Sequence, residues 1–436
     1  MRISTILLSV MLLITAFIAK AQPLNNEWID YNKTYYKFSV GSNGLYRITQ
    51  PILAGLGLAN VQAQHFQLWR NGKQVPLFTT TNAVLPNDGF LEFYGLRNDG
   101  AADKDVYRYA QYQISDRLSL FTDTAAFFLT VNTATPNLRI TNVLNDVAGN
   151  TLPAEPWFMH KERINYNSQI NRGEANTSYG EAIYSSSYDK GEFLSSFDIN
   201  PGTPLNSFFF NVGAVNVPNT TAKLEIGVAG ASNLGTTRRF EVVIGGTTYI
   251  NQPLTRFDYG VFAADVPMSV LPNGVNASLP FTVRNLSTNP NDRFVVGYAQ
   301  LTYPRAFNFS NLPLYEFSLP ASTQGNYLEV ANFNHTGVPP VLYDLTNMQR
   351  YVGDIQPSGL VRFRLVPSVT ERNLVLMSTA SNGMQQVTRI TTRNFVNYAQ
   401  ASAQGDYLII YHPNLAGGAN PVEQYRAYRA SATGGG

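Results

Sequence analysis

The sequence has 436 residues and a formal net charge of +2, and only 14% of its residues are charged, below the roughly 25% of an ordinary soluble domain. This near balance of charge gives no indication of a surface that binds nucleic acid or an anionic membrane. Cysteine is absent, which excludes disulfides, a cysteine nucleophile and a zinc–thiolate site within these residues. With 44% hydrophobic residues, the sequence predicts two or three domains held together by large apolar cores.

Residues 1–21 have the pattern of a secretory signal peptide. Arg2 supplies the positive charge, residues 6–18 form the apolar segment, and residues 19–21 read Ala-Lys-Ala, a cleavage site that would leave Gln22 first. A membrane anchor is the alternative, but the apolar segment is shorter than the ~20 residues that span a bilayer. We therefore expect export to the periplasm, cell surface or exterior, with no membrane span after cleavage.

Residues 22–152 are predicted to form an N-terminal β domain. Asn43 and Gly44, between the first two expected strands, are a strong signal for a hairpin. Asn71 and Gly72 predict a second turn, towards residues 75–78. A short helix is expected at residues 51–58. Apolar or alternating segments predict strands at residues 37–40, 45–48, 66–70, 90–94 and 127–131.

Residues 153–305 are predicted to form a β-sandwich of the jelly-roll kind. The domain begins with a polar segment, residues 160–191, which we expect to be a long excursion. Gly245 and Gly246 predict a tight hairpin, and the short spacing of strands and turns is typical of a sandwich or jelly roll. Strands are expected at residues 208–212, 223–228, 240–244, 247–250, 260–266, 279–283 and 294–303.

Residues 306–400 are predicted to form a small β domain, and residues 404–436 to begin a different fold. The small domain has expected strands at residues 326–330, 340–345, 361–365 and 373–377. Residues 407–411 then form an apolar run that suits a parallel strand, and Pro421 suits the first turn of a helix. The sequence ends before a neighbouring strand, so this apolar strand would dock on the β domains or remain disordered.

Six segments stand in a characteristic order along the chain: residues 36–48, 66–77, 91–95, 292–305, 341–347 and 406–413. In that order they resemble segments of the secreted gingipain-type cysteine peptidases of Bacteroidetes, which include the sortase-like peptidases of type IX secretion. The resemblance implies β-rich N-terminal domains followed by a caspase-like α/β domain with a His-Cys dyad, a cysteine endopeptidase. It also implies that both dyad residues and a secretion-signal domain would follow residue 436.

The predicted fold class is therefore mainly β, with consecutive β-sandwich or jelly-roll-like domains followed by the first β-α unit of an incomplete caspase-like domain. We assign no catalytic, cofactor-binding or metal-binding residue, and we expect this chain to be inactive alone. Its expected role is to support or position the missing catalytic domain, with a protein substrate or cell-surface glycan as further partner. The alternative is a secreted adhesin or carbohydrate-binding protein without enzymatic activity.

Isolated histidines and a short acidic segment were considered as sites. His412 follows the predicted parallel strand, where α/β sites gather, but without a cysteine a structural role is favoured. His65, His160 and His335 have no second ligand at metal spacing. Residues 99–105 carry Asp99, Asp103 and Asp105 and could bind calcium, although a solvated turn is favoured.

Three other chemistries have weaker sequence support. Residues 185–187 are consecutive serines without a nucleophile elbow. A glycosidase would need two facing carboxylates, and the candidates are Glu155, Glu162, Glu174 and Glu181. Sugar stacking would use exposed aromatic rings, and the candidates are Tyr166, Tyr179, Tyr184 and Tyr188. The simpler interpretation is that these tyrosines cover one end of a sandwich. Residues 123–125 read Asp-Thr-Ala, which resembles a bacterial O-glycosylation sequon.

Overall fold

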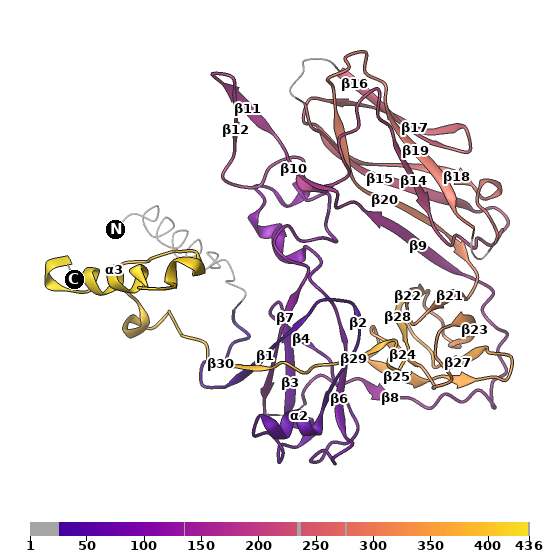
Figure 1. The fold of residues 1–436 in the computed structure, drawn as a ribbon. Helices are drawn as coiled ribbons and strands as arrows, with labels where there is room; N and C mark the ends of the chain where they lie inside the picture. Colours follow the sequence, from indigo (N-terminus) through magenta and orange to yellow (C-terminus); the bar gives the residue numbers. More distant parts are fainter. Residues whose placement is uncertain (1–25, 135, 233–236, 275–276, 435–436) are drawn as a thin grey trace, which may run out of the picture.

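The structure is a computed structural model that describes residues 26–434 except 135, 233–236 and 275–276. The predicted signal peptide therefore lies outside the described residues. The described chain is mostly β, as predicted, and forms three β units and a helical C-terminal segment (Figure 1). Over this described part, none of the helices has the length and apolarity needed to cross a membrane.

The first unit is a sandwich of two sheets in the strand orders β30-β1-β7-β3-β4 and β29-β2-β6-β5. Its core lies between the sheets, where Phe38, Leu68 and Phe93 are buried. The predicted short helix is present as α2 (Gln50–Gly55), with Pro51 in its first turn. The strands are β1 (Tyr35–Val40), β2 (Gly44–Thr49), β3 (Phe66–Arg70), β4 (Lys73–Val75), β5 (Phe78–Thr79), β6 (Phe90–Gly95), β7 (Ala125–Val131), β29 (Met384–Gln386) and β30 (Thr391–Arg393).

One hairpin prediction in this unit is confirmed and the other is wrong. Asn71 and Gly72 both have positive φ (48° and 72°) and connect β3 to β4 as a tight hairpin. By contrast, Asn43 and Gly44 do not connect a hairpin, because β1 pairs with β7 and β30 whereas β2 pairs with β6 and β29. The inward side chains of β1 and β2 pack into the same core, so these two strands lie in opposite sheets and face each other across it. Asn43 instead accepts a hydrogen bond from the backbone N–H of Arg97 through Oδ1 (3.0 Å).

The second unit is a jelly roll. Taken in chain order, its eight described sandwich strands form one sheet in the order first-eighth-third-sixth (β9-β20-β15-β18) and another in the order second-seventh-fourth-fifth (β14-β19-β16-β17). Gly245 and Gly246, with φ of 57° and 82°, form the predicted hairpin. The strands are β9 (Phe158–Asn165), β14 (Leu205–Phe209), β15 (Thr221–Gly230), β16 (Thr237–Ile244), β17 (Thr247–Thr255), β18 (Tyr259–Pro267), β19 (Leu279–Asn285) and β20 (Phe294–Arg305).

The segment predicted as a long excursion is only partly outside the sandwich. Its beginning, β9, pairs with β20 along eight residues, so the prediction is wrong there. This strand was missed because the polar His160 and Glu162 lie on the same inward face as Phe158 and Ile164, which hid the apolar alternation. The rest forms two short ladders, β10 (Gln169–Arg172) with β13 (Glu192–Ser195) and β11 (Ala175–Ser178) with β12 (Glu181–Tyr184), at the top of Figure 1.

The third unit also has two sheets, in the orders β21-β23-β27-β26 and β22-β28-β24-β25-β8. The four strands predicted from the sequence are present as β23, β24, β27 and β28. The strands are β8 (Thr141–Asn142), β21 (Asn308–Leu312), β22 (Leu314–Leu319), β23 (Asn326–Phe333), β24 (Val341–Asp344), β25 (Gln349–Val352), β26 (Asp354–Ile355), β27 (Val361–Leu365) and β28 (Arg372–Met377).

The first and third units exchange strands and share a core. Strand β8, from the end of the first unit, pairs with β25 of the third, while β29 and β30, which follow the third unit, join the two sheets of the first. These segments cross the domain boundaries drawn from the sequence. The shared cluster contains Leu45, Phe78, Tyr94, Ile140, Val341, Tyr343, Val375 and Met377.

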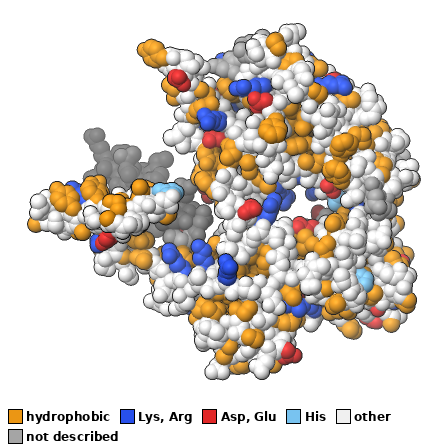
Figure 2. Space-filling model, viewed as in Figure 1, with side chains coloured by type: hydrophobic (Ala, Val, Ile, Leu, Met, Phe, Trp, Pro, Cys, Tyr) orange, Lys and Arg blue, Asp and Glu red, His pale blue; other side chains and the backbone are white. Residues whose placement is uncertain are grey.

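The C-terminal segment contains the predicted helix but not the predicted strand. Helix α3 (Pro421–Arg429) begins after Asn420, whose side chain accepts from the N–H of Glu423. Residues 407–411 form no strand, because the described residues place no neighbouring strand beside them. Leu408 and Ile410 are 81% and 87% exposed, and Figure 2 shows hydrophobic side chains over this segment at the left of the molecule.

Candidate functional site at the strap over the first sandwich

Residues 384–393, which we call the strap, connect the two sheets of the first unit. Strand β29 runs parallel to β2, with Leu45 opposite Met384, and β30 runs antiparallel to β1, with Lys37 opposite Thr391. Between them, Val387 is buried in the sandwich core and donates its N–H to the carbonyl of Arg47 (2.9 Å). The strap thus covers the edges of the two sheets beside the corner where the chain passes from β1 to β2.

An aromatic cluster holds the chain just after the strap. The ring of Phe395 lies 5.6 Å from Trp28, 5.1 Å from Tyr35 and 5.4 Å from Phe128, measured between centroids. Trp28 also contacts Trp69 at 5.5 Å. Aromatic pairs at these separations contribute about 0.5–1.5 kcal/mol each beyond the area they bury. The point at which the chain leaves the first unit is therefore fixed.

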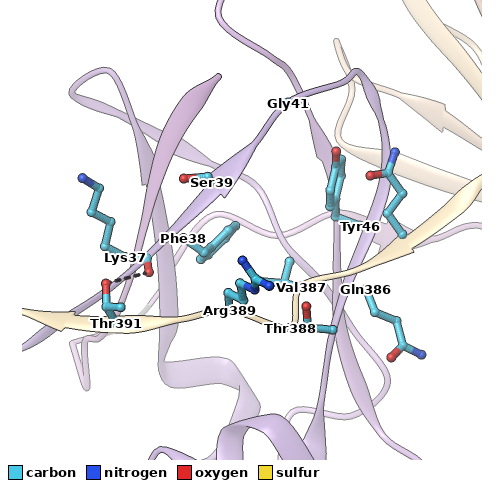
Figure 3. A pocket seen from close by; sticks show the side chains of 11 residues that line it. Lys37, Phe38, Ser39, Gly41, Tyr46, Gln386, Val387, Thr388, Arg389 and Thr391 are labelled. Atoms are coloured by element: carbon cyan, nitrogen blue, oxygen red, sulfur yellow. Dashed lines mark hydrogen bonds between the residues drawn. The ribbon is translucent and has the colours of Figure 1, made fainter. Parts of the chain in front are cut away.

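A pocket of about 580 Å³ lies between the strap and the β1–β2 corner (Figure 3). Phe38 and Tyr46 line it and are themselves almost fully buried. The wall formed by the strap and β1 is polar, with the hydroxyls of Ser39, Thr388 and Thr391 and two glutamine amides. The lining residues are Lys37, Phe38, Ser39, Gly41, Tyr46, Gln385, Gln386, Val387, Thr388, Arg389 and Thr391.

The charged residues that line this pocket are both cations. Lys37 projects from β1 and Arg389 from the strap (Figure 3), and both residues are exposed. Within the described part of the chain, neither side chain forms an ion pair or a side-chain hydrogen bond. The pocket can therefore attract an anion without first breaking an internal salt bridge.

The backbone of β1 beside the pocket forms part of a sheet edge. The carbonyl of Lys37 faces the strap, since it accepts a hydrogen bond from Thr391 Oγ1 (3.5 Å), drawn as a dashed line in Figure 3. Backbone polar groups of successive strand residues alternate in direction, so those of Ser39 face the same edge. The pairing of β1 with the strap extends from Tyr35 to Lys37, which leaves Ser39 beyond it.

A buried charge cluster ties the first unit to the third. Glu92 is fully buried on β6 and accepts from Arg47 of the same sheet (2.8 Å). It also accepts from Tyr343 (2.6 Å) and Arg350 (3.0 Å) of the third unit. Burial, and then the charge of Glu92, raises the pKa of Tyr343 well above its ordinary value, which keeps its hydroxyl a donor. The unit that carries the strap is thus joined to the third unit by this charge cluster as well as by the shared apolar cluster.

The four histidines do not come together. His412 is exposed, and its Nδ1 accepts from the N–H of Asn414 at the start of a short 3₁₀ helix. His160 lies between the jelly roll and the third unit, with Nε2 3.0 Å from Glu162 and Nδ1 3.3 Å from the Tyr315 hydroxyl. His65 ends a 3₁₀ helix before β3, and Nδ1 of His335 accepts from the N–H of Gly337.

The acidic segment is more structured than predicted. Asp99 and Asp105 lie at the surface, but Asp103 is buried, so the prediction of a solvated turn is wrong at that residue. Its two oxygens accept from Ser119 Oγ (2.9 Å) and from the N–H of Leu120 (2.7 Å), which ties two loops together. Among the described residues, no group of three His, Cys, Asp or Glu side chains is arranged to hold a metal ion.

The tyrosines considered for sugar stacking do not form one platform. Tyr166 packs against the jelly-roll core, and Tyr188 stacks on Phe121. Tyr179 is fully exposed in the β11–β12 turn, and Tyr184 lies at the end of β12. Tyr184 lines a second pocket of about 540 Å³ at the base of this hairpin.

The candidate carboxylates and hydroxyls contact different partners. Glu155 accepts from Asn326, Glu162 contacts His160, Glu174 pairs with Lys190, and Glu181 is exposed. Ser185 accepts from Arg108. In the segment resembling a glycosylation sequon, Thr124 precedes β7 and donates its hydroxyl to Asp123 (3.1 Å).

Sequence reasoning missed the strap, because its two strands have three residues each and carry mostly polar side chains. The available signal was Val387 and Ile390, two apolar residues in a polar segment, which both contact the first core. The partners of β29 and β30 lie more than 300 residues earlier in the chain, so no turn or periodic signal near the strap indicates the pairing.

Comparison with known proteins supports the fold. No family model matches the chain, and no curated protein is significantly similar in sequence. The structure is similar to dimeric latent PorU from Porphyromonas gingivalis, with a TM-score of 0.51, 10% identity and coverage of 82% of this chain. The chain spans 33% of the length of that PorU chain. At this identity the similarity concerns the fold alone.

Two carbohydrate-binding modules are also among the similar structures. One is a CBM36 module in complex with calcium and xylotriose (TM-score 0.19, 11% identity, 32% of this chain and 98% of the module). The other is a CBM6 module from Zobellia galactanivorans (TM-score 0.18, 12% identity, 33% of this chain and 99% of the module). TM-scores this low carry no argument about this chain.

Proposed function

We propose that this chain is the non-catalytic, β-rich N-terminal portion of an exported, PorU-like member of the gingipain-type peptidases, and that it holds a following α/β domain in place. The observation that carries the proposal is the strap. It returns the chain to the first unit directly before the segment that resembles the start of a caspase-like domain. The type of peptidase and its substrate belong to that following domain.

The strap suits this role because its contacts resist displacement. It pairs with both sheets at once, and Val387 and Ile390 bury apolar side chains beneath it. Phe395 then anchors the chain on the outer face of the first sheet. Releasing the chain would expose the buried Val387, at about 1.5–3 kcal/mol for a fully buried large apolar side chain, and the partly buried Ile390 and Phe395 at a smaller cost each.

The exposed apolar run fits the same proposal. Leu408 and Ile410 would be covered once a parallel strand lay beside residues 407–411 and helices covered the sheet. We expect the gene to continue past the codon for Gly436 into alternating strands and helices that contain a His and then a Cys. A stop codon directly after Gly436 would overturn the proposal.

A protein-level test examines the anchor. Phe395→Ala is expected to increase severalfold the rate of limited proteolysis between residues 394 and 404, because the chain loses three aromatic contacts. Tyr398→Ala is the matched control, since Tyr398 is 67% exposed. Equal cleavage of both variants and the unsubstituted chain would show that Phe395 does not hold the exit point.

Carbohydrate binding is a second candidate function, favoured by the second pocket. Tyr184 is 41% exposed there, and Gln169, Asn171 and Arg172 offer planar polar groups suited to sugar hydroxyls. A glycan-binding screen with the full chain tests it, with Tyr184→Ala as the variant and Tyr179→Ala as the control. No binding to any polysaccharide, or binding unaffected by Tyr184→Ala, would remove this candidate.

A further inference from the structure

We propose that the pocket between the strap and the β1–β2 corner binds an extended acidic peptide, which adds to the free edge of β1 at Ser39. This goes beyond the proposed function, because the ligand is a separate polypeptide segment and not the domain that follows the strap. Three features of the pocket carry the inference: its charge, its sheet edge and its size.

The charge of the pocket selects an acidic ligand. Lys37 of β1 and Arg389 of the strap both line it, and none of its lining residues is acidic. As neither cation has an ion-pair partner among the described residues, a bound carboxylate gains attraction without displacing an existing one. The hydroxyls of Ser39 and Thr388 and the amide of Gln386 add hydrogen-bond donors beside the cations.

The sheet edge selects a polypeptide. The N–H and C=O of Ser39 face the side of β1 that the strap leaves unpaired, since the ladder with β30 ends at Lys37. An extended peptide satisfies such groups by continuing the ladder, which is the usual way in which peptides bind to sheet edges. A glycan or a free phosphate could engage the cations but would not supply the regular spacing of amide groups.

The size and shape of the pocket are consistent with a short segment. Its volume of about 580 Å³ lies within the ~300–1,000 Å³ range of ligand pockets. Phe38 and Tyr46 provide an apolar floor, so the methyl group of a small side chain such as Thr can lie against them while its acidic neighbours face the cations. Alternating acidic and small residues therefore fit best, because side chains alternate along a strand.

The test uses the full chain and a fluorescent, end-blocked hexapeptide of alternating Glu and Thr, with fluorescence anisotropy as the readout. We expect saturable binding that weakens as salt is added, and no binding of the matching Lys-Thr peptide. Lys37→Gln with Arg389→Gln is expected to weaken binding about tenfold, as two partly exposed charge contacts are lost. Lys161→Gln with Arg239→Gln removes the same charge from the jelly-roll surface and is expected to change nothing.

The role of the β1 edge is tested by changing the backbone of the peptide. A Glu-Thr peptide with N-methylated backbone amides keeps its charges but cannot continue a ladder, so we expect it to bind at least about tenfold more weakly. Equal binding of the two peptides would overturn the proposal. So would tighter binding of a heparin oligosaccharide or inorganic phosphate than of the peptide, or unchanged binding by the Lys37→Gln, Arg389→Gln variant. Thermal melting of each variant confirms that these exposed substitutions leave the fold intact.

Discussion

The jelly roll and the first sandwich are both two-sheet β units, but they are assembled differently. The jelly-roll strands all lie between Phe158 and Arg305. The first sandwich instead takes β29 and β30 from residues that follow the third unit, so that Tyr35 pairs with Arg393. All strands of the jelly roll therefore come from one continuous stretch of chain, whereas the first sandwich takes two of its strands from a distant segment.

The buried charges of the two units follow the same division. In the jelly roll, Arg238 and Asp292 are both fully buried and pair within the unit at 2.6 Å. In the first sandwich, Glu92 is equally buried but shares its oxygens between Arg47 of its own unit and Arg350 of the third. The Arg238–Asp292 pair lies within one unit, whereas the Glu92 cluster joins two units. We therefore expect substitution of Asp292 to destabilise the jelly roll alone, and substitution of Glu92 to destabilise both the first and the third unit.

Glu92→Ala is expected to have the largest effect. It leaves Arg47 and Arg350 without their partner in a buried interface, which costs up to about 5 kcal/mol of unfolding free energy. Hydrogen exchange measured segment by segment should show faster exchange in both the first and third units and little change in the jelly roll. Tyr343→Phe removes one hydrogen bond to Glu92 and should cost only about 1 kcal/mol. Loss confined to the first unit would contradict the description of Glu92 as a connection.

Asp292→Ala should produce a loss of about 3–4 kcal/mol that is confined to the jelly roll. Only one guanidinium, that of Arg238, loses its carboxylate partner, and it keeps its hydrogen bond to the carbonyl of Arg256 (2.8 Å), so the loss is smaller than at Glu92, where two arginines lose theirs. The same hydrogen-exchange experiment measures it. Faster exchange in the first or third unit as well would show that the jelly roll is not independent.

The difference between the units also explains what the sequence could predict. Local signals succeeded wherever structure is local: the hairpins at Asn71 and at Gly245, the apolar strands of the jelly roll, and the helix beginning at Pro421. The mainly β class followed from the same strand and turn signals.

Sequence reasoning failed where pairing is distant. The turn residues at Asn43 suggested a hairpin, yet the partners of β1 and β2 include strands near residues 384 and 393. The candidate pocket shares this origin, because Lys37 and Arg389 line the same pocket only through that pairing. The sequence shows that both residues are charged, but it does not show how the strap pairs with β1 and β2, because tertiary contacts set that register.

The junction between the jelly roll and the third unit should respond to pH through His160. Burial lowers the pKa of His160, a hydrogen bond to Glu162 opposes this, and the charge of Arg305 lowers it further; Tyr303 and Tyr315 also face the ring. The unfolded chain, with a pKa of ~6.5, therefore binds a proton more readily than the folded chain. Stability is full above about pH 6.5 and falls below it, by up to about 1.4 kcal/mol per pH unit, until the folded pKa is reached.

Urea unfolding from pH 8 to pH 5 measures this slope, and His160→Gln is the variant that should flatten it. His335→Gln is the control, because His335 lies in an exposed turn. A slope that persists in His160→Gln would assign the effect to other groups. Faster hydrogen exchange in β9 and β22 at low pH, without faster exchange in β1 or β2, would show that the loss of stability begins at the junction between the jelly roll and the third unit.

The smallest effect is expected for Arg284→Gln, on the outer surface of the jelly roll. Arg284 pairs with Glu241 at 3.1 Å, against 2.6 Å in the buried Arg238–Asp292 pair, and its side chain is 51% exposed. Water already solvates the charge, so loss of the pair should cost less than about 1 kcal/mol in the same urea titration. The two pairs lie in one unit but differ in exposure and in hydrogen bonding, since Arg238 makes three hydrogen bonds to Asp292 and Arg284 makes one to Glu241, so the ratio of their effects measures what burial and the fork geometry add together. A loss as large as that of Asp292→Ala would mean that burial does not set the size of these energies, and the magnitude expected for Glu92→Ala would lose its basis.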